Sequence, residues 1–281
     1  MPSPSAPEAS SQPRSRTRGF RLQAVPPLRP LRVGVLALSP DAGTALIEPL
    51  SRAALPVHPI RIHLDAADAR GSESSLTVSL TRAILDEPLD GLVLVGAHEH
   101  DAEPSSPPQW RELTEILEYA RGFIPSTLGL GAGAVVLARV LGLDLVPLDQ
   151  ELRGLLPQRS LRAEHSLLNG SSEVFFSTEA RRLRITDASI DDAVAAGRVT
   201  PLARSRDAGV SIFESADRRY VAHLGRPERP PMRPSVEGRI SAFYDSARES
   251  ARAHAAAFFA AWVRQIYEVG RKGAEASLVA P

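Results

Sequence analysis

The first half of this chain alternates short apolar runs with segments of helical spacing, and no other feature of the sequence restricts the fold as much. The apolar runs are rich in Val, Ile and Leu, which is typical of strands that are buried on both faces. Each run is followed by a segment whose apolar residues recur every three or four positions. We therefore expect strands at 31–38, 57–64, 91–97 and 126–131, and helices at 42–53, 76–85, 107–121 and 134–142.

This order of elements predicts an α/β fold, with a mostly parallel sheet and helices on both of its faces. Ligands of such sheets bind outside the carboxyl ends of the strands. The loops after the third and fourth predicted strands, 96–100 and 129–133, are therefore the candidate site. The second half is less regular, and we expect in it a strand at 173–185, a hairpin at 210–224, a proline-rich loop at 226–235 and a long amphipathic helix at 249–272.

Composition bounds the class of protein. The 281 residues carry no net charge, so nothing attracts the chain to nucleic acid or to an anionic membrane. No cysteine is present, which excludes disulfides, a thiolate nucleophile and cysteine-bound metals. No apolar run approaches the roughly 20 residues that span a bilayer. The chain start has no apolar middle of a secretion signal, and we expect a cytoplasmic protein with a disordered tail at 1–29, one domain at 30–272 and a short tail at 273–281.

The stretch PSTLGLGAGAVVLARVLGL (125–143) admits two interpretations. Gly129, Gly131 and Ala134 fit the G-x-G-x-x-G/A turn that binds a dinucleotide pyrophosphate, but that turn normally follows the first strand. Gly129 and Gly133 also fit the G-x-x-x-G frame of a nucleophile elbow, a tight strand-to-helix turn. The position after the fourth predicted strand favours the elbow. Its tip, however, is Gly131, which offers no nucleophile.

A resemblance to a known family is carried by five segments in order. They are RPLRVGVLALSP (29–40), LDGLVLVGAHEH (89–100), QWRELTEILEYARGFIPSTLGLGAGA (109–134), YVAHLGRPE (220–228) and RESARAHAAAFFAAWVRQIYE (248–268). They resemble the homoserine O-succinyltransferase/O-acetyltransferase family. The resemblance implies a flavodoxin-like fold of the class I glutamine amidotransferase type, with a C-terminal helical segment.

The family resemblance also implies a chemistry and shows what this chain lacks. Family members are similar in using a Cys–His–Glu set, in which the cysteine accepts an acyl group from acyl-CoA and homoserine then attacks the thioester. The resemblance puts the cysteine at Gly131, the histidine at Arg226 and the glutamate at Glu228. An oxyanion-holding backbone N–H falls at Ala132. Glycine carries no nucleophile, and a protonated arginine is no general base.

Four further substrate-binding positions follow from the same resemblance. His100 stands at the family's acyl-selecting position, Arg70 aligns with a lysine after the second strand, and Arg239 lies near an arginine that is implicated in carboxylate binding. His98 lies beside His100 at the predicted mouth of the site. Either histidine is a candidate base for direct attack on acyl-CoA or, in the alternative, a solvated loop residue. With Glu99 and Asp101 they are also a candidate metal pair, but no third ligand can be named, and we predict no metal.

Other polar residues have structural interpretations beside functional ones. We expect Ser126 and Thr127 to be buried hydrogen-bonding residues, His223 a structural histidine and His254 a packing or capping residue. Arg226 and Glu228 either pair with each other or leave Arg226 to bind a carboxylate or phosphate. The stripe of Phe258, Phe259, Trp262 and Ile266 is expected in the core rather than in an interface.

Two functions remain open at this point. The first is a catalytically degenerate homologue, linked to methionine and sulfur amino-acid metabolism, that keeps a ligand pocket. The alternative is an active acyl-CoA-dependent O-acyltransferase that acts on homoserine, serine or a related hydroxyl without a covalent intermediate. We expect no cofactor, an amino acid or acyl-CoA as the small-molecule partner (acyl-CoA as co-substrate), and a homodimer as one candidate assembly.

Overall fold

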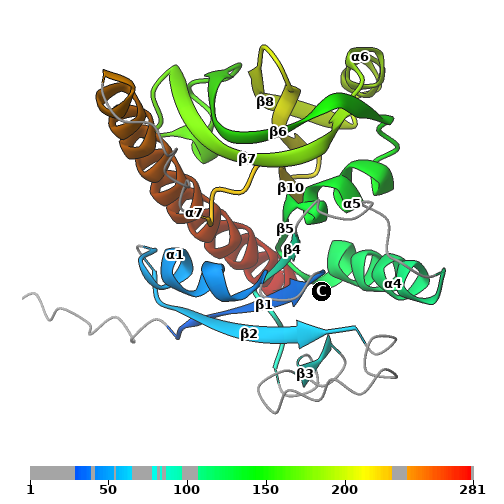
Figure 1. Cartoon of the computed structure of the whole chain (residues 1–281). Helices are drawn as coiled ribbons and strands as arrows, with labels where there is room; N and C mark the ends of the chain where they lie inside the picture. Colours follow the sequence, from blue (N-terminus) through cyan, green and yellow to red (C-terminus); the bar gives the residue numbers. More distant parts are fainter. Residues whose placement is uncertain are drawn as a thin grey trace, which may run out of the picture.

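Ten strands form a single sheet in a computed structural model of the chain (Figure 1). The structure describes residues 29–38, 42–53, 55–64, 78–80, 83, 87–96, 107–229 and 239–279; the side chains of 78, 107–109, 239–242 and 271–279 lie outside this description. The strand order is β3-β2-β1-β4-β5-β10-β9-β8-β6-β7. The predicted α/β class is confirmed.

The first half of the chain builds the parallel half of the sheet, as its alternation predicts. All pairings from β3 through β5 are parallel. One expectation was wrong in part: Val78 and Ser79, inside the predicted helix 76–85, pair with β2 as a short strand, whereas Leu80 and Ala83 are helical. Backbone hydrogen bonds to the edge of β2 outweigh the helical spacing at Val78 and Ser79. The strands are β1 (Leu31–Ala37), β2 (Val57–His63), β3 (Val78–Ser79), β4 (Gly91–Gly96) and β5 (Ser126–Gly131).

The second half adds antiparallel strands beyond β5. β10 pairs with β5 in parallel and with β9 antiparallel, so it joins the two halves of the sheet. The sequence predicted β7 and the β9–β10 hairpin but not the long β6, β8 or the short helix α6. These strands are β6 (Leu145–Ser160), β7 (Val174–Ile185), β8 (Val199–Ser205), β9 (Gly209–Ser215) and β10 (Tyr220–His223), and α6 spans Asp187–Ala195.

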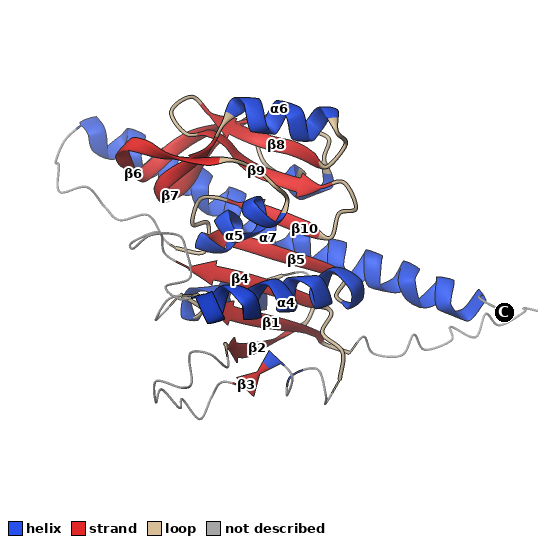
Figure 2. Ribbon diagram, turned by 90° about the vertical axis from the view of Figure 1, so that its right-hand side faces the viewer, coloured by secondary structure: helices blue, strands red, loops and turns tan. Residues whose placement is uncertain are grey.

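Helices cover both faces of the sheet. Figure 2 shows α4 and α5 in front of the sheet and α7 behind it, the face on which α1 also packs. α7 is longer than the predicted helix at both ends, while α1 is a single short turn that follows a 3-10 turn. The helices are α1 (Ile47–Ser51), α4 (Pro107–Phe123), α5 (Ala132–Val140) and α7 (Arg239–Val279), and the 3-10 turns are Thr44–Leu46 and Ser166–Leu168.

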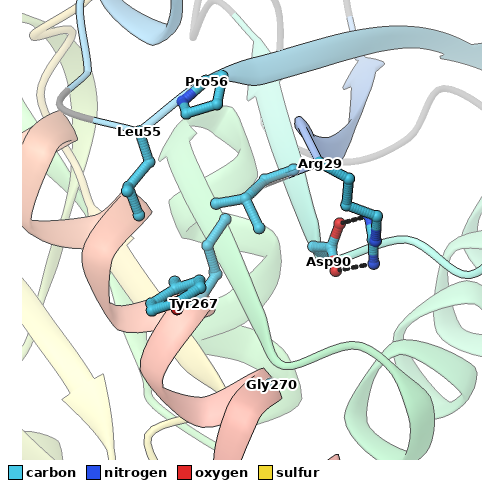
Figure 3. A pocket seen from close by; sticks show the side chains of 8 residues that line it. Arg29, Leu55, Pro56, Asp90, Tyr267 and Gly270 are labelled. Carbon is cyan, nitrogen blue, oxygen red and sulfur yellow. Dashed lines mark hydrogen bonds and ion pairs between the residues drawn. The ribbon is translucent and has the colours of Figure 1, made fainter. Parts of the chain in front are cut away.

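A pocket lined by described residues lies at the amino ends of the strands (Figure 3). It has a volume of about 230 Å³ and lies between Leu31 at the start of β1, Leu55, and Tyr267 of α7. At its edge the Asp90 carboxylate accepts two hydrogen bonds of 2.8 Å from the guanidinium of Arg29. This is the end of the sheet opposite to the predicted site, so the pocket is not the ligand site that the parallel strands predict.

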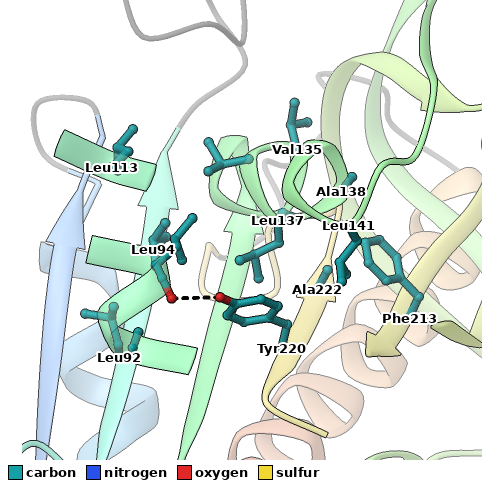
Figure 4. Close-up of a cluster of buried hydrophobic side chains, with 14 of the residues drawn as sticks. Leu92, Leu94, Leu113, Val135, Leu137, Ala138, Leu141, Phe213, Tyr220 and Ala222 are labelled. Atoms are coloured by element: carbon teal, nitrogen blue, oxygen red, sulfur yellow. Dashed lines mark hydrogen bonds between the residues drawn. The ribbon is translucent and has the colours of Figure 1, made fainter. Parts of the chain in front are cut away.

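The core lies on both faces of the parallel strands. Side chains alternate along β4, so that Leu92 and Leu94 face α4 and α5 while Val93 and Val95 face α1 and α7. Figure 4 shows Leu92 and Leu94 beside helix residues that include Leu113 and Leu137. The hydroxyl of Tyr220 donates a 2.8 Å hydrogen bond to the carbonyl oxygen of Leu117 in α4. This packing fixes α4 and α5 on the sheet, and with them the turn between β5 and α5.

Candidate functional site

The predicted elbow is a sharp turn between β5 and α5. Gly131 ends β5 and is the N-cap residue of α5, with φ 56° and ψ −116°. A residue with a side chain adopts this conformation only with strain. The first amides of α5 lack acceptors within the helix, as at any helix N-terminus, and Ala132 is the first residue of α5. The backbone therefore has the geometry of a nucleophile elbow.

The neighbouring glycines are required by close packing. A Cβ atom at Gly129 would lie 2.6 Å from the carbonyl oxygen of Gly133, and one at Gly133 would lie 2.1 Å from that of Leu94. Both distances are too short for any side chain, so α5 begins directly against β4 and β5. The G-x-x-x-G spacing is thus explained by the approach of helix and strand, without a phosphate.

Arg226 covers the tip of the elbow. A Cβ atom on Gly131 would lie 2.7 Å from Cδ of Arg226 and 2.5 Å from the carbonyl oxygen of Gly96. The Nε–H of Arg226 donates to Oε1 of Glu228 at 2.5 Å, and these side chains are only 2% and 0% exposed. Of the two alternatives for Arg226, the structure contains the ion pair with Glu228. The space above the elbow is occupied by the side chain of Arg226.

The burial of this ion pair has electrostatic consequences. Desolvation raises the pKa of the Glu228 carboxyl, and the adjacent Arg226 guanidinium opposes that rise. The pairing leaves Nη2 of Arg226 and Oε2 of Glu228 without a hydrogen-bond partner among the described residues, although both atoms are buried. A buried guanidinium N–H and a buried carboxylate oxygen thus remain unsatisfied beside the elbow.

The loop that carries Arg226 is attached to the elbow by its backbone. The N–H of Gly131 donates to the carbonyl oxygen of Gly225 at 3.2 Å, and the N–H of Arg226 donates to that of Thr178 on β7 at 2.7 Å. These contacts exist because β10 lies beside β5 in parallel, so both strands end at the same edge of the sheet. The elbow and the Gly225–Arg229 segment therefore form one unit.

Two buried histidines, His223 and His254, are connected to this unit by hydrogen bonds. Nδ1 of His223 accepts from the N–H of Gly225 at 3.1 Å, and Nε2 of His223 lies 3.3 Å from Nε2 of His254. Nδ1 of His254 lies 3.0 Å from the hydroxyl of Ser171. This pattern assigns the proton of neutral His223 to Nε2 and that of His254 to Nδ1. Both residues are structural, as the sequence predicts, and His254 also stacks on Phe175 with ring centroids 3.9 Å apart.

A buried charged pair that the sequence analysis missed lies beneath Gly225. Glu179 and Arg181 of β7 are fully buried, with Oε2 and Nε 3.3 Å apart, and Gln158 donates to Oε1 of Glu179 at 3.0 Å. A Cβ atom on Gly225 would lie 2.8 Å from Oε1 of Glu179. Burial raises the pKa of Glu179 and lowers that of Arg181. The signal in the sequence was two charges, two positions apart, on one side of a predicted strand.

The remaining predicted site residues are not brought to the elbow by the described part of the chain. Arg70, His98 and His100 lie outside the described residues, as do Glu99 and Asp101. Arg239 begins α7, but its side chain lies outside the description. Their substrate-binding roles therefore stay predictions.

Among the smaller predictions, Ser126 is a buried hydrogen-bonding residue, because its hydroxyl accepts from Nε1 of Trp262 at 3.1 Å. Thr127 is buried as well, but its hydroxyl has no hydrogen-bond partner, which corrects that part of the expectation. The stripe of Phe258, Phe259, Trp262 and Ile266 is at most 1% exposed and belongs to the core.

Two negative findings concern the described residues alone. Within them, no three His, Asp or Glu side chains are grouped so that they could hold a metal ion. No helix in the described ranges is long and apolar enough to cross a membrane.

Comparison with known proteins agrees with the family resemblance seen in the sequence and with the observed fold. The model of the homoserine O-succinyltransferase family matches residues 23–233. The chain is 28% identical over 211 residues to a homoserine O-acetyltransferase of Lachnoclostridium phytofermentans, covering 72% of this chain and 68% of that protein. It is 27% identical to the homoserine O-acetyltransferase of Brevibacillus brevis, with 73% and 68% covered.

Solved structures with a similar fold are glutamine amidotransferases. The enzyme from Thermotoga maritima superposes with a TM-score of 0.55 at 15% identity, covering 84% of this chain and 98% of that one. The enzyme from Methylobacillus flagellatus gives 0.53 at 14% identity, with 85% and 95% covered. At these identities the similarity shows the fold alone.

Proposed function

Because this chain belongs to the homoserine O-succinyltransferase family, we propose that it is a catalytically degenerate member, which keeps a ligand site at the elbow and has lost covalent acyl transfer. The observation that carries this proposal is Gly131 at the elbow tip, covered by the side chain of Arg226. A covalent acyl-enzyme needs a nucleophile at the tip and a base beside it.

The chemistry of the residues present supports the loss of this route. The chain contains no cysteine, and the guanidinium of Arg226 stays protonated. Glu228, the one member of the family's set that this chain keeps, is paired with Arg226 at 2.5 Å. Loss of nucleophile and base together lowers the rate of such enzymes by about 10⁶-fold, and only binding and backbone electrostatics remain. We include in this proposal a link of the retained site to amino-acid metabolism, including methionine; membership of the family supports it.

The test is an acyl-transfer assay with restored chemistry. Wild-type protein is compared with Gly131→Cys/Arg226→His for transfer from acetyl-CoA and succinyl-CoA to homoserine and serine. The second substitution is needed for space as well as for a base, because a Cβ atom at Gly131 meets Cδ of Arg226 at 2.7 Å. We expect activity in the double variant and none above background in the wild type.

The matched control is Arg226→His alone, which removes the close contact with Cδ of Arg226 and adds a base but no nucleophile. It should remain inactive. Wild-type turnover comparable to that of ordinary acyltransferases would contradict the proposal and establish the non-covalent enzyme instead. Thermal shift with acyl-CoA and with homoserine tests the retained site, and if neither ligand stabilises any variant, that part of the proposal is wrong.

A further inference from the structure

The Gly225–Arg229 segment holds three buried polar atoms that have no hydrogen-bond partner in the part of the chain that the structure describes. They are Nη2 of Arg226, Oε2 of Glu228 and Nε of Arg229. Arg226 and Glu228 are 2% and 4% exposed as whole residues. Buried side-chain polar atoms in folded proteins are almost always satisfied, and each exception needs a partner or a function. Three such atoms lie within four residues, which makes this turn a candidate place for a bound partner.

These three residues belong to one tight turn on the elbow. The N–H of Arg229 donates to the carbonyl oxygen of Arg226 at 3.0 Å, which closes a four-residue turn. The hydroxyl of Thr178 donates to the carbonyl oxygen of Arg229 at 3.2 Å and holds the other end of the turn on β7. Cδ of Arg226 lies over Gly131, the N-cap residue of α5. The side chain of Arg226 thus lies beside the start of that helix, and the turn that carries Glu228 and Arg229 continues from it.

The N-terminus of α5 is an independent anion-binding element. The helix has nine residues, no side chain caps its first turn, and Ala132, Gly133 and Ala134 are buried there. The first amides of a helix carry a partial positive charge. Where the start of a helix is buried, these amides need hydrogen-bond acceptors from elsewhere. The N–H of Gly131 is satisfied by Gly225, but the helix itself offers no acceptor to the following amides.

We propose that the elbow binds a small oxyanion, the carboxylate or phosphate group of a metabolite, between the start of α5 and the guanidinium groups of Arg226 and Arg229. The two positive guanidinium groups and the partial positive charge of the helix N-terminus together outweigh the single negative charge of Glu228. Oε2 of Glu228 accepts from a hydroxyl or amino group beside the anion. The inference rests on the proposed function, because the site binds the anion as a ligand and not as a reaction intermediate.

The test is a titration of the full chain with each anion, in which calorimetry measures the binding. Acetate, succinate and inorganic phosphate are titrated at constant ionic strength, with chloride as the reference anion. We expect saturable binding of one of the three, weakened about tenfold or more by Arg226→Gln, because a charge-assisted hydrogen bond is lost. The matched control is Arg182→Gln, since Arg182 is an exposed arginine that pairs with Glu151 on β6.

A second variant keeps the proposal falsifiable if Arg226→Gln does not fold. Glu228→Gln keeps the shape of the side chain but removes its negative charge, which repels a bound anion. This variant should therefore bind the anion severalfold more tightly. Absence of saturable binding below about 10 mM for all three anions overturns the proposal. So does an Arg226→Gln variant with unchanged affinity, or weaker binding in Glu228→Gln. The affinities of succinate and acetate, compared with that of phosphate, show whether the site prefers a carboxylate or a phosphate group. The acyl-transfer assay tests the proposed function separately.

Discussion

At the scale of single residues, Gly131 and Arg226 depend on each other. The positive φ of 56° and the atoms 2.5 Å and 2.7 Å from its ideal Cβ position leave no room for a side chain at Gly131. We expect Gly131→Ala to lower the free energy of unfolding by about 3 kcal/mol, through backbone strain and overpacking. Urea denaturation followed by circular dichroism measures this change.

A matched control for Gly131 exists in α4. A Cβ atom on Gly122 meets no atom within 4 Å, so Gly122→Ala should leave stability unchanged or raise it by up to about 1 kcal/mol. In an Arg226→Ala background the penalty of Gly131→Ala should shrink, because one of its two close contacts is gone. An equal penalty in both backgrounds would show that Arg226 does not cover the elbow in solution.

The buried histidine pair predicts a pH dependence of stability. Burial lowers the pKa of His254 from 6.5 to about 3, and burial, with the nearby His254 and Arg181, lowers the pKa of His223 well below its usual value. The unfolded chain binds protons at these residues below pH 6.5 and the folded chain does not, so stability falls as the pH falls. For His254 alone the loss is about 2 kcal/mol between pH 6.5 and about pH 5.

Denaturation at a series of pH values checks this prediction. His254→Gln keeps a hydrogen-bonding side chain but removes one titrating group, so its stability should depend less steeply on pH. His58→Gln, which replaces an exposed histidine on β2, is the control for the substitution itself. A wild-type stability that is constant from neutral pH to about pH 5 would contradict the assignment of two neutral buried histidines.

At the scale of elements, Trp262 is a main packing contact of α7 with the face of the sheet. Trp262 is fully buried, its Nε1–H donates to Ser126 of β5, and its ring edge lies beneath Gly91 of β4. Trp262→Ala should lower the free energy of unfolding by about 4 kcal/mol, because it leaves a large cavity. Trp262→Phe should lose less, since it keeps most of the buried area but not the hydrogen bond.

The control for this contact is on the same helix. Arg264 is exposed, so Arg264→Ala should change the free energy of unfolding by no more than about 0.5 kcal/mol. Chemical denaturation of the three variants tests the contact. A Trp262→Ala variant as stable as Arg264→Ala would mean that α7 does not pack on β5 in this register.

At the scale of the whole molecule, β10 and α7 tie the two halves of the sheet together. β10 pairs with β5 on one side and with β9 on the other. α7 contacts Ser126 on β5 through Trp262 and Phe175 on β7 through His254. We expect the parallel and antiparallel halves to unfold in a single cooperative transition.

Hydrogen exchange followed by mass spectrometry in increasing urea measures this cooperativity. Peptides from 126–140 and from 199–215 should lose protection at the same urea concentration. Loss of protection in 199–215 at clearly lower urea would show that the antiparallel half is a separate folding unit.

The sequence predicted much of the parallel half because that half is governed by local patterns. Continuous apolar runs such as 91–97 have one stable environment, a strand covered on both faces. The helical spacing at 76–85 was a weaker guide, because pairing with β2 decided the structure of Val78 and Ser79. Local patterns also missed β6, whose mixed polar and apolar residues are half-exposed and held by neighbouring strands.

The candidate site shows the same division. The sequence by itself determined that the elbow tip is glycine, that the chain has no cysteine, and that arginine stands in the G-x-P-E turn. Only the tertiary structure decided that Arg226 lies over Gly131, that it pairs with Glu228, and that three polar atoms remain buried without partners. The physical reason is that residue types fix which groups are present, whereas the parallel pairing of β5 and β10, which joins residues about 100 positions apart, fixes where these groups meet.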